Sequence, residues 1–284
     1  MIIATVATSL NQYVEEYIHQ LKKLKYNYRI LGLNQPWKGF ATKMKMYFEM
    51  LGSVSPDEII VVCDSYDLLF LQDASTLLET YNRLAQNKVV IGLENINKHY
   101  CNISVICDPK VIEECKITNP YFEDFIYPNA GFIMGRAKDL RDIFQFMLDE
   151  KHTDDQYGLF QWIKRNCKKC YFDVHLDFVF NYTPEPFTKK LNIKIQDGQL
   201  TVQYKTNKSS PCVVHMWAHY LDYGYRSERV RNALFPNRQQ ISKLKYLDEF
   251  YGKLCKPEFY YFGYWWWMII LFIGLIVILC VFIK

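Results

Sequence analysis

The sequence lacks the features that mark several large classes of protein. Its formal net charge is +4 over 284 residues, and its lysines are spread along the chain instead of forming a basic stripe, which speaks against nucleic-acid binding. It contains no internal repeat and no low-complexity tract. The amino terminus lacks the basic start and the cleavage site of a signal peptide. These absences leave a globular domain, and a chain of this length that is half apolar can bury one sizeable core.

Charged residues are absent from one long stretch, residues 265–283, which is almost wholly apolar. About 20 apolar residues are enough to cross the core of a bilayer. Tyrosines and tryptophans at its start resemble the aromatic belt of a membrane interface. A buried core helix is the alternative, but no further segment follows to pack around it. We therefore predict a transmembrane tail anchor, with the lysines before it placing the rest of the chain in the cytosol; a lumenal domain is the alternative.

The number and spacing of the cysteines suggest neither a disulfide framework nor a structural zinc site. They are nine in number and scattered, and the single C-x-x-C at residues 167–170 has no second pair at zinc spacing. In a cytosolic domain we expect all of them to be free thiols. Glycosylation sequons at Asn102, Asn181 and Asn207 would matter only if the domain were lumenal.

The hydrophobic pattern predicts an α/β fold. Short apolar runs alternate with helically spaced ones up to residue 94, and this order predicts a parallel sheet with right-handed crossovers. The pattern weakens between residues 95 and 127, and shorter strands and helices follow. The predicted strands are residues 2–7, 29–33, 59–62, 88–93, 130–135 and short runs up to 214, and the predicted helices are 11–25, 41–51, one from Asp73, 140–148, 154–163 and 241–251. We assign residues 1–254 to one domain, 255–264 to a linker and 265–283 to the membrane helix.

Two carboxylates, Asp64 and Asp67, follow the buried strand at 59–62. Open α/β sheets bind ligands at the carboxyl ends of their strands. Carboxylate oxygens at this spacing suit Mg²⁺ or Mn²⁺, and such ions usually keep a substrate diphosphate among their ligands. The alternative is a turn in which an aspartate side chain accepts hydrogen bonds from backbone amides. Spacing alone does not decide between the two.

Other polar residues end predicted strands or begin helices. His215 follows an apolar strand and could be a third metal ligand, or a core histidine bonded to backbone. Thr153 and Gln156 have the spacing of a capping box, and Asp154 or Asp155 between them could bind or deprotonate an acceptor hydroxyl. Two further candidates carry weaker signals: Asn129, before a small-residue pair, and Lys43, which could face phosphate or solvent.

Together these motifs resemble the glycosyltransferase domain of the procollagen-lysine hydroxylases, the lysyl hydroxylase and collagen glucosyltransferase family. The similarity covers about residues 2–225. Its most specific part is Asp64-Ser65-Tyr66-Asp67, which resembles the metal motif of the family. The other matching segments, in the same order as in the family, are Ala4–Thr8, Leu31–Leu33 with Trp37 and Lys43, Asn129–Ile133, Asp154–Gln156 and Val213–His215.

The resemblance implies a fold of the GT-A type, with a central mixed, mainly parallel sheet. It also implies transfer of a hexose, glucose or galactose, from a UDP-sugar to a hydroxyl acceptor, such as hydroxylysine or its galactosyl derivative on a collagen-like protein. Manganese, or magnesium, would be the cofactor. We expect the protein to be a stand-alone, membrane-anchored hexosyltransferase, which would suit a virus or a host endomembrane by analogy.

The same resemblance implies a role for each site residue. The metal ligands would be Asp64, Asp67 and His215. Tyr66 would stack on uracil, and the strand end formed by Thr5, Val6 and Ala7 would hold uridine next to Asp64. Lys43 would face the phosphates of the donor. Asp154 or Asp155 would contact the acceptor hydroxyl, with Asn129 and Glu94 as neighbours.

One loop departs from the family. After its metal histidine the family has Gly-Asn-Gly-Pro, which lets the backbone lie against the diphosphate, whereas residues 216–219 here are Met-Trp-Ala-His. This departure motivates an alternative function, a catalytically silent, membrane-anchored interaction protein that keeps the glycosyltransferase fold.

Overall fold

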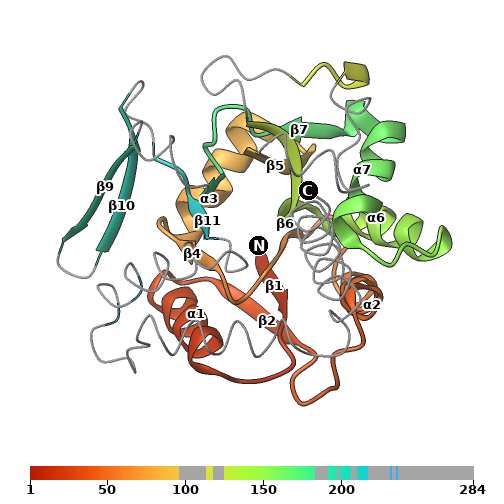
Figure 1. Cartoon of the computed structure of the whole chain (residues 1–284), viewed down its shortest axis with the longest axis horizontal. Helices are drawn as coiled ribbons and strands as arrows, with labels where there is room; N and C mark the ends of the chain where they lie inside the picture. The colour runs from red at the N-terminus through yellow and green to blue at the C-terminus, as the bar shows by residue number, and fades with distance from the viewer. Residues whose placement is uncertain are drawn as a thin grey trace, which may run out of the picture.

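The computed structural model describes residues 1–95, 113–117, 125–182, 191–196, 199–205, 210–216, 231 and 235. These residues form a six-stranded main sheet covered by helices, a three-stranded sheet beside it and a two-stranded hairpin (Figure 1). The elements are β1 (Ile2–Val6), α1 (Gln12–Lys23), β2 (Asn27–Leu31), α2 (Phe40–Gly52), β3 (Ile59–Cys63), β4 (Leu68–Phe70), α3 (Ala74–Thr80) with a π-helical turn (Tyr81–Ala85), β5 (Val89–Asn95), β6 (Phe125–Arg136), α6 (Ala137–Asp149), α7 (Asp155–Asn166) with a 3-10 turn (Cys167–Lys169), β7 (Cys170–Phe172), β8 (Val179–Tyr182), β9 (Leu191–Gln196), β10 (Gln199–Tyr204) and β11 (Val213–Met216).

The main sheet has the order β2-β1-β3-β6-β5-β7. Strand β1 pairs in parallel with β2 and β3, and β5 pairs in parallel with β7. Strand β6 runs antiparallel to both of its neighbours, β3 and β5. The prediction of a mixed α/β sheet is confirmed, and the arrangement fits a GT-A-like fold.

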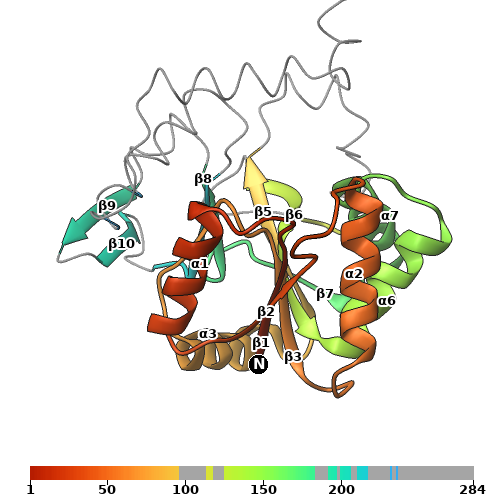
Figure 2. The same ribbon diagram turned by 90° about the horizontal axis from the view of Figure 1, so that it is seen from below.

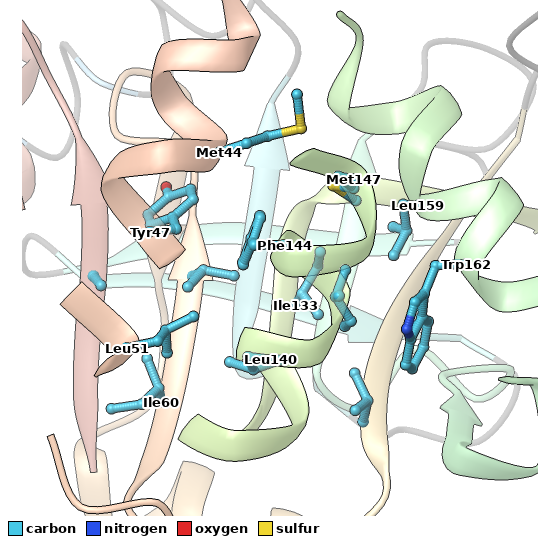
Figure 3. Packing of buried hydrophobic residues seen from close by; sticks show 14 of the residues in the cluster. Met44, Tyr47, Leu51, Ile60, Ile133, Leu140, Phe144, Met147, Leu159 and Trp162 are labelled. Atoms are coloured by element: carbon cyan, nitrogen blue, oxygen red, sulfur yellow. The ribbon is translucent and has the colours of Figure 1, made fainter. Parts of the chain in front are cut away.

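Helices cover both faces of this sheet. Figure 2 shows α2, α6 and α7 on one face, and α1 and α3 on the other. On α2, Met44, Tyr47 and Leu51 recur at helical spacing and are buried, so one stripe of the helix faces the core. They pack with Phe144 of α6, and further along with Trp162 of α7, in one hydrophobic cluster (Figure 3). Burial of each such side chain contributes about 1.5–3 kcal/mol, which fixes α2 and α7 against the sheet.

The three-stranded sheet has the order β4-β11-β8 and was not expected from the sequence. Strand β4 is only three residues long and begins directly after Asp67, so its short apolar sequence did not predict a separate strand. Strand β11 pairs antiparallel with β4, with His215 opposite Leu68. This register places the histidine beside Asp67, although the two are far apart in the sequence.

Helix starts follow the sequence in one case and differ in another. Asp73 caps α3 by accepting a hydrogen bond from the backbone N–H of Thr76 at 2.9 Å, as expected from a helix that begins there. The predicted capping box at Thr153 is wrong. Asp154 is the N-cap of α7 and accepts from Tyr157 N at 2.7 Å, because the Gln156 side chain is engaged with strand β6 instead.

The expectation that all cysteines are free thiols is also wrong. Cys115 and Cys167 form a disulfide, while Cys63, Cys170 and Cys212 are free and buried among the described residues. The bond joins positions 52 residues apart, which no sequence spacing indicates. Because Cys167 is bonded to Cys115, the C-x-x-C at 167–170 is not a pair of free thiolates.

Several predictions lie outside the described residues. They are the membrane helix at 265–283, the linker at 255–264, the closing helix at 241–251 and the sequons at Asn102 and Asn207. No helix in the part of the chain that the structure describes is both long and apolar enough to cross a membrane. The third sequon asparagine, Asn181, is described and completely buried, with its side chain hydrogen-bonded.

Candidate active site

Asp64, Asp67 and His215 come together at the carboxyl end of β3. One oxygen or nitrogen from each lies within 4.8 Å of those of the other two. His215 Nε2 is 3.4 Å from Asp67 Oδ2 and 3.9 Å from Asp64 Oδ2. The side chains of Asp67 and His215 are 12% and 5% exposed, whereas that of Asp64 keeps 35%. The cluster is therefore built into the fold and open on the Asp64 side.

These three residues fit a divalent cation. Donor atoms that bind one small cation at about 2.1 Å lie roughly 3–4 Å from each other, as His215 Nε2 lies from one oxygen of each aspartate. Two carboxylate oxygens with one imidazole nitrogen suit Mn²⁺ or Mg²⁺ better than the soft, thiolate-binding metals. The arrangement is compatible with the predicted ligand set.

The orientation of the His215 ring is fixed by Asn181 on the neighbouring strand β8. Asn181 Nδ2 donates to the Leu93 carbonyl at 2.9 Å, which turns its Oδ1 toward His215. His215 Nδ1 lies 2.7 Å from that oxygen, so Nδ1 carries the proton. Nε2 then faces the two aspartates. A buried partner that sets the tautomer is typical of metal-binding histidines.

Gly131 on β6 makes room for the same ring. A Cβ atom at this position would lie 2.4 Å from His215 Cε1 and 2.9 Å from both His215 Nδ1 and Asn129 Oδ1. Its carbonyl accepts a hydrogen bond from Asp64 N at 3.1 Å, which extends the pairing of β3 and β6 to the first carboxylate. Only glycine allows the strand and the imidazole to approach so closely.

Lys43 joins the cluster of Asp64, Asp67 and His215 to α7. From α2, its Nζ donates to Asp64 Oδ1 at 2.6 Å and to Asp155 Oδ2 at 2.7 Å. Burial favours the neutral amine, but the Asp155 and Asp64 carboxylates hold the pKa of Lys43 well above its ordinary value. The ammonium is therefore retained next to Asp64, where the resemblance predicted a phosphate-facing lysine.

Burial and the neighbouring carboxylates raise two further pKa values at the cluster. Burial raises the pKa of Asp64, against the lowering effect of Lys43, and the nearby Asp67 adds to the rise. Burial by itself would lower the pKa of His215, but Asp67 raises it above the ordinary value. Asp64 and His215 thus hold protons more tightly than usual. A bound divalent cation would replace these protons as the positive charge beside the carboxylates.

Glu94 and Asn129 lie next to the cluster in a buried hydrogen-bonded group. Asn129 Nδ2 donates to Glu94 Oε2 at 2.7 Å, and Gln156 Nε2 donates to Glu94 Oε1 at 3.0 Å. The amide oxygens in turn accept from Gly131 N and Ala130 N. Burial raises the pKa of Glu94 to about 8, against the lowering effect of Asn129. This group fixes the start of α7 to β6.

On the expected nucleotide side, Thr5 is buried and its hydroxyl donates to the Cys63 carbonyl at 2.7 Å. It therefore braces β1 against β3 instead of facing a ligand through its hydroxyl. Val6 and Ala7 lie at the same strand end and are buried. Tyr66, between Asp64 and Asp67, is partly exposed, and contact of these residues with uridine stays a prediction.

Sequence reasoning missed the roles of three residues of this region. Asn181 ends an apolar strand in the way that His215 does, and that shared pattern could have found it. The reach of Gln156 to β6, where its Nε2 also donates to the Pro128 carbonyl at 2.7 Å, was hidden by the apparent capping box. Arg231, whose Nη2 donates to the Tyr66 carbonyl at 2.7 Å, gave no local signal.

A mixed α/β sheet with two aspartates after its strand β3, and a histidine beside them on the small sheet, fits the class of GT-A-like glycosyltransferases. Residues 1–220 match the family described as the PLOD GT domain. The match covers more than half of the chain, so the chain belongs to this family of glycosyltransferase domains.

Individual relatives are distant. A multifunctional procollagen lysine hydroxylase and glycosyltransferase from Caenorhabditis elegans is 22% identical over 225 residues, which cover 68% of this chain and 29% of that protein. The chain therefore spans less than a third of the length of this relative. Among solved structures, A197 from STIV is 11% identical with a TM-score of 0.37, covering 60% of this chain and 80% of that one. A similarity this low carries no argument.

Proposed function

We propose that this protein is a metal-dependent glycosyltransferase that moves a hexose, glucose or galactose, from a UDP-sugar to a hydroxyl acceptor. The observation that carries the proposal is the Asp64, Asp67 and His215 cluster, in which the Asn181 contact aims His215 Nε2 at both carboxylates. A divalent cation held there, Mn²⁺ or Mg²⁺, supplies Lewis-acid neutralisation of the charge on a departing diphosphate.

The residues around the cluster would bind the donor phosphate, act on the acceptor and hold α7 in place. Lys43 keeps its positive charge at the Asp64 edge, which suits a phosphate oxygen of the donor. Asp154 and Asp155 begin α7 beside Lys43 and would orient or deprotonate the acceptor hydroxyl. Glu94 and Asn129 would hold this edge of α7 in place through Gln156.

The acceptor, the location and the membrane attachment are parts of the same proposal. The Caenorhabditis elegans relative is named as both a procollagen lysine hydroxylase and a glycosyltransferase, which supports a hydroxylysine of a collagen-like protein as the acceptor, with its galactosyl derivative as the alternative. Attachment to the bilayer would come from residues 265–283, with the domain in the cytosol, and rests on the sequence alone.

The proposal is tested by UDP release from purified protein with Mn²⁺ and a panel of UDP-sugars. We expect turnover by the parent protein and its loss in Asp64→Ala and Asp67→Ala. The matched control is Asp57→Ala, which removes an exposed carboxylate paired with Lys138, before the start of β3. Equal turnover by the parent and both site variants would refute the assignment. Absence of Mn²⁺-dependent UDP binding by calorimetry would instead support the silent interaction protein.

A further inference from the structure

Arg231 is a completely buried arginine beside the metal loop, the segment Asp64 to Asp67. Its Nη1 donates to Glu16 Oε2 of α1 at 3.0 Å, and its Nη2 donates to the backbone carbonyl of Tyr66 at 2.7 Å. The guanidinium carbon also lies 5.3 Å from the centre of the Tyr13 ring. One side chain thus connects helix α1 to the middle of the metal loop.

Helix α1 holds both ends of the same loop by other contacts. At the entry, Tyr17 Oη lies 3.1 Å from Cys63 Sγ, next to Asp64. At the exit, Gln20 Oε1 accepts from Phe70 N at 2.8 Å, after Asp67. Among the described residues, the Arg231 contact links α1 to the loop centre, so its loss would loosen the peptide between Asp64 and Asp67.

A lysine at this position could not replace the arginine. The planar guanidinium offers two N–H groups in a fixed fork, one for Glu16 and one for the Tyr66 carbonyl, whereas an ammonium is a single point charge on a flexible stem. Glu16 is itself 6% exposed, so removal of the arginine alone leaves a buried carboxylate without this partner.

Arg231 also lies beyond residues 1–220, the segment that matches the family.

We propose that Arg231 is a positioning residue for the metal loop, supplied by the part of the chain that follows the family match. By holding the Tyr66 carbonyl, it fixes the peptide that precedes Asp67 and so sets the direction of that carboxylate toward His215. The inference rests on the proposed function only in that the loop binds a metal. It does not depend on which sugar or acceptor is used.

The test compares Arg231→Met with the double variant Glu16→Leu/Arg231→Met in the full-length protein. The double variant removes the buried pair together and leaves no unpaired carboxylate, so it remains folded if the single variant does not. Arg136→Met is the control, because Arg136 pairs with Asp139 at the opposite end of the sheet. The measurements are amide hydrogen exchange of residues 64–70 without metal and direct Mn²⁺ titration.

We expect faster exchange of residues 64–70 in the double variant and a Mn²⁺ affinity about 10-fold weaker, with β6 and the control unchanged. A purely structural role would lower the melting temperature but leave the loop exchange and the Mn²⁺ affinity of the folded protein unchanged, and that result overturns the inference. If the parent binds Mn²⁺ but transfers no sugar, the proposed function fails while the role of Arg231 stands.

Discussion

At the scale of single residues, the site depends on how closely β6 approaches the His215 ring. Gly131→Ala adds a Cβ atom that would lie 2.4 Å from His215 Cε1, so the ring must move. We expect a loss of Mn²⁺ affinity of about 10-fold or more, by analogy with other changes that displace a metal ligand. Isothermal titration with Mn²⁺ measures it.

The control for this change is Gly135→Ala on the same strand. There the nearest atom to an added Cβ is Leu140 Cδ2 at 3.3 Å, the end of a side chain that can shift. Mn²⁺ binding by this variant should equal that of the parent. Equal affinities for Gly131→Ala and the parent would show that the ring position does not matter for binding.

The Asn181 contact gives a second residue-scale prediction. Asn181→Leu keeps the side-chain size but removes the oxygen that accepts from His215 Nδ1, so the ring loses its fixed tautomer. We expect Mn²⁺ affinity to fall by about 10- to 100-fold and to become more sensitive to pH. Titration of Mn²⁺ at pH 6, 7 and 8 checks this. Asn166→Leu, which removes a contact to the Trp162 carbonyl far along α7, is the matched control.

At the scale of elements, the start of α7 separates two neighbouring aspartates. Asp154 Oδ1 caps the helix, whereas Asp155 is bound to Lys43. Burial raises the pKa of Asp154, which favours it as the group that takes a proton from an acceptor. Asp154→Asn preserves the cap, because asparagine caps as well as aspartate, and should keep stability but lower turnover.

Two variants complete the comparison at this helix. Asp154→Ala removes the cap and should lower stability by about 1 kcal/mol in urea unfolding. Asp155→Asn removes one of the two carboxylates around Lys43 and should weaken donor binding more than the turnover of bound donor. Full turnover by Asp154→Asn would assign the acceptor chemistry to another residue.

The elements also show what the sequence could and could not predict. The strands β1, β2, β3 and β5 and helices α1, α2 and α6 follow directly from hydrophobic periodicity, and Asp64 and Asp67 were located by the strand that precedes them. Strand β4 was overlooked because three buried residues give no period of their own. The antiparallel direction of β6 and the pairing of β11 with β4 arise from tertiary contacts. The strand pattern therefore left His215 open between a metal ligand and a core histidine, and the family resemblance favoured the ligand.

At the scale of the whole molecule, the Cys115–Cys167 disulfide closes a loop of 52 residues. The chain-entropy account gives about 4 kcal/mol of stabilisation for such a loop, and about 2–4 kcal/mol is typical. We expect dithiothreitol or Cys115→Ser to lower the free energy of unfolding in urea by this order. The control is dithiothreitol treatment of Cys115→Ser, which should cause no further loss. Disulfides persist in oxidising compartments, so mass mapping of this pair in cells also tests the predicted cytosolic location.

The buried Glu94 predicts how global stability depends on pH. Its pKa is about 8 in the folded protein against 4.5 in the unfolded chain, because burial penalises the ionised form. Between these values the folded state binds the extra proton, so stability falls as pH rises from about 5 to 8, by up to about 1.4 kcal/mol per pH unit, and is level above.

Urea unfolding in EDTA from pH 5 to 9 measures this slope. Glu94→Gln loses one acceptor, facing Asn129 or Gln156, and should be less stable at low pH but have a flatter profile. An unchanged slope in Glu94→Gln would assign the titration to His215 or Asp64, whose raised pKa values act in the same direction.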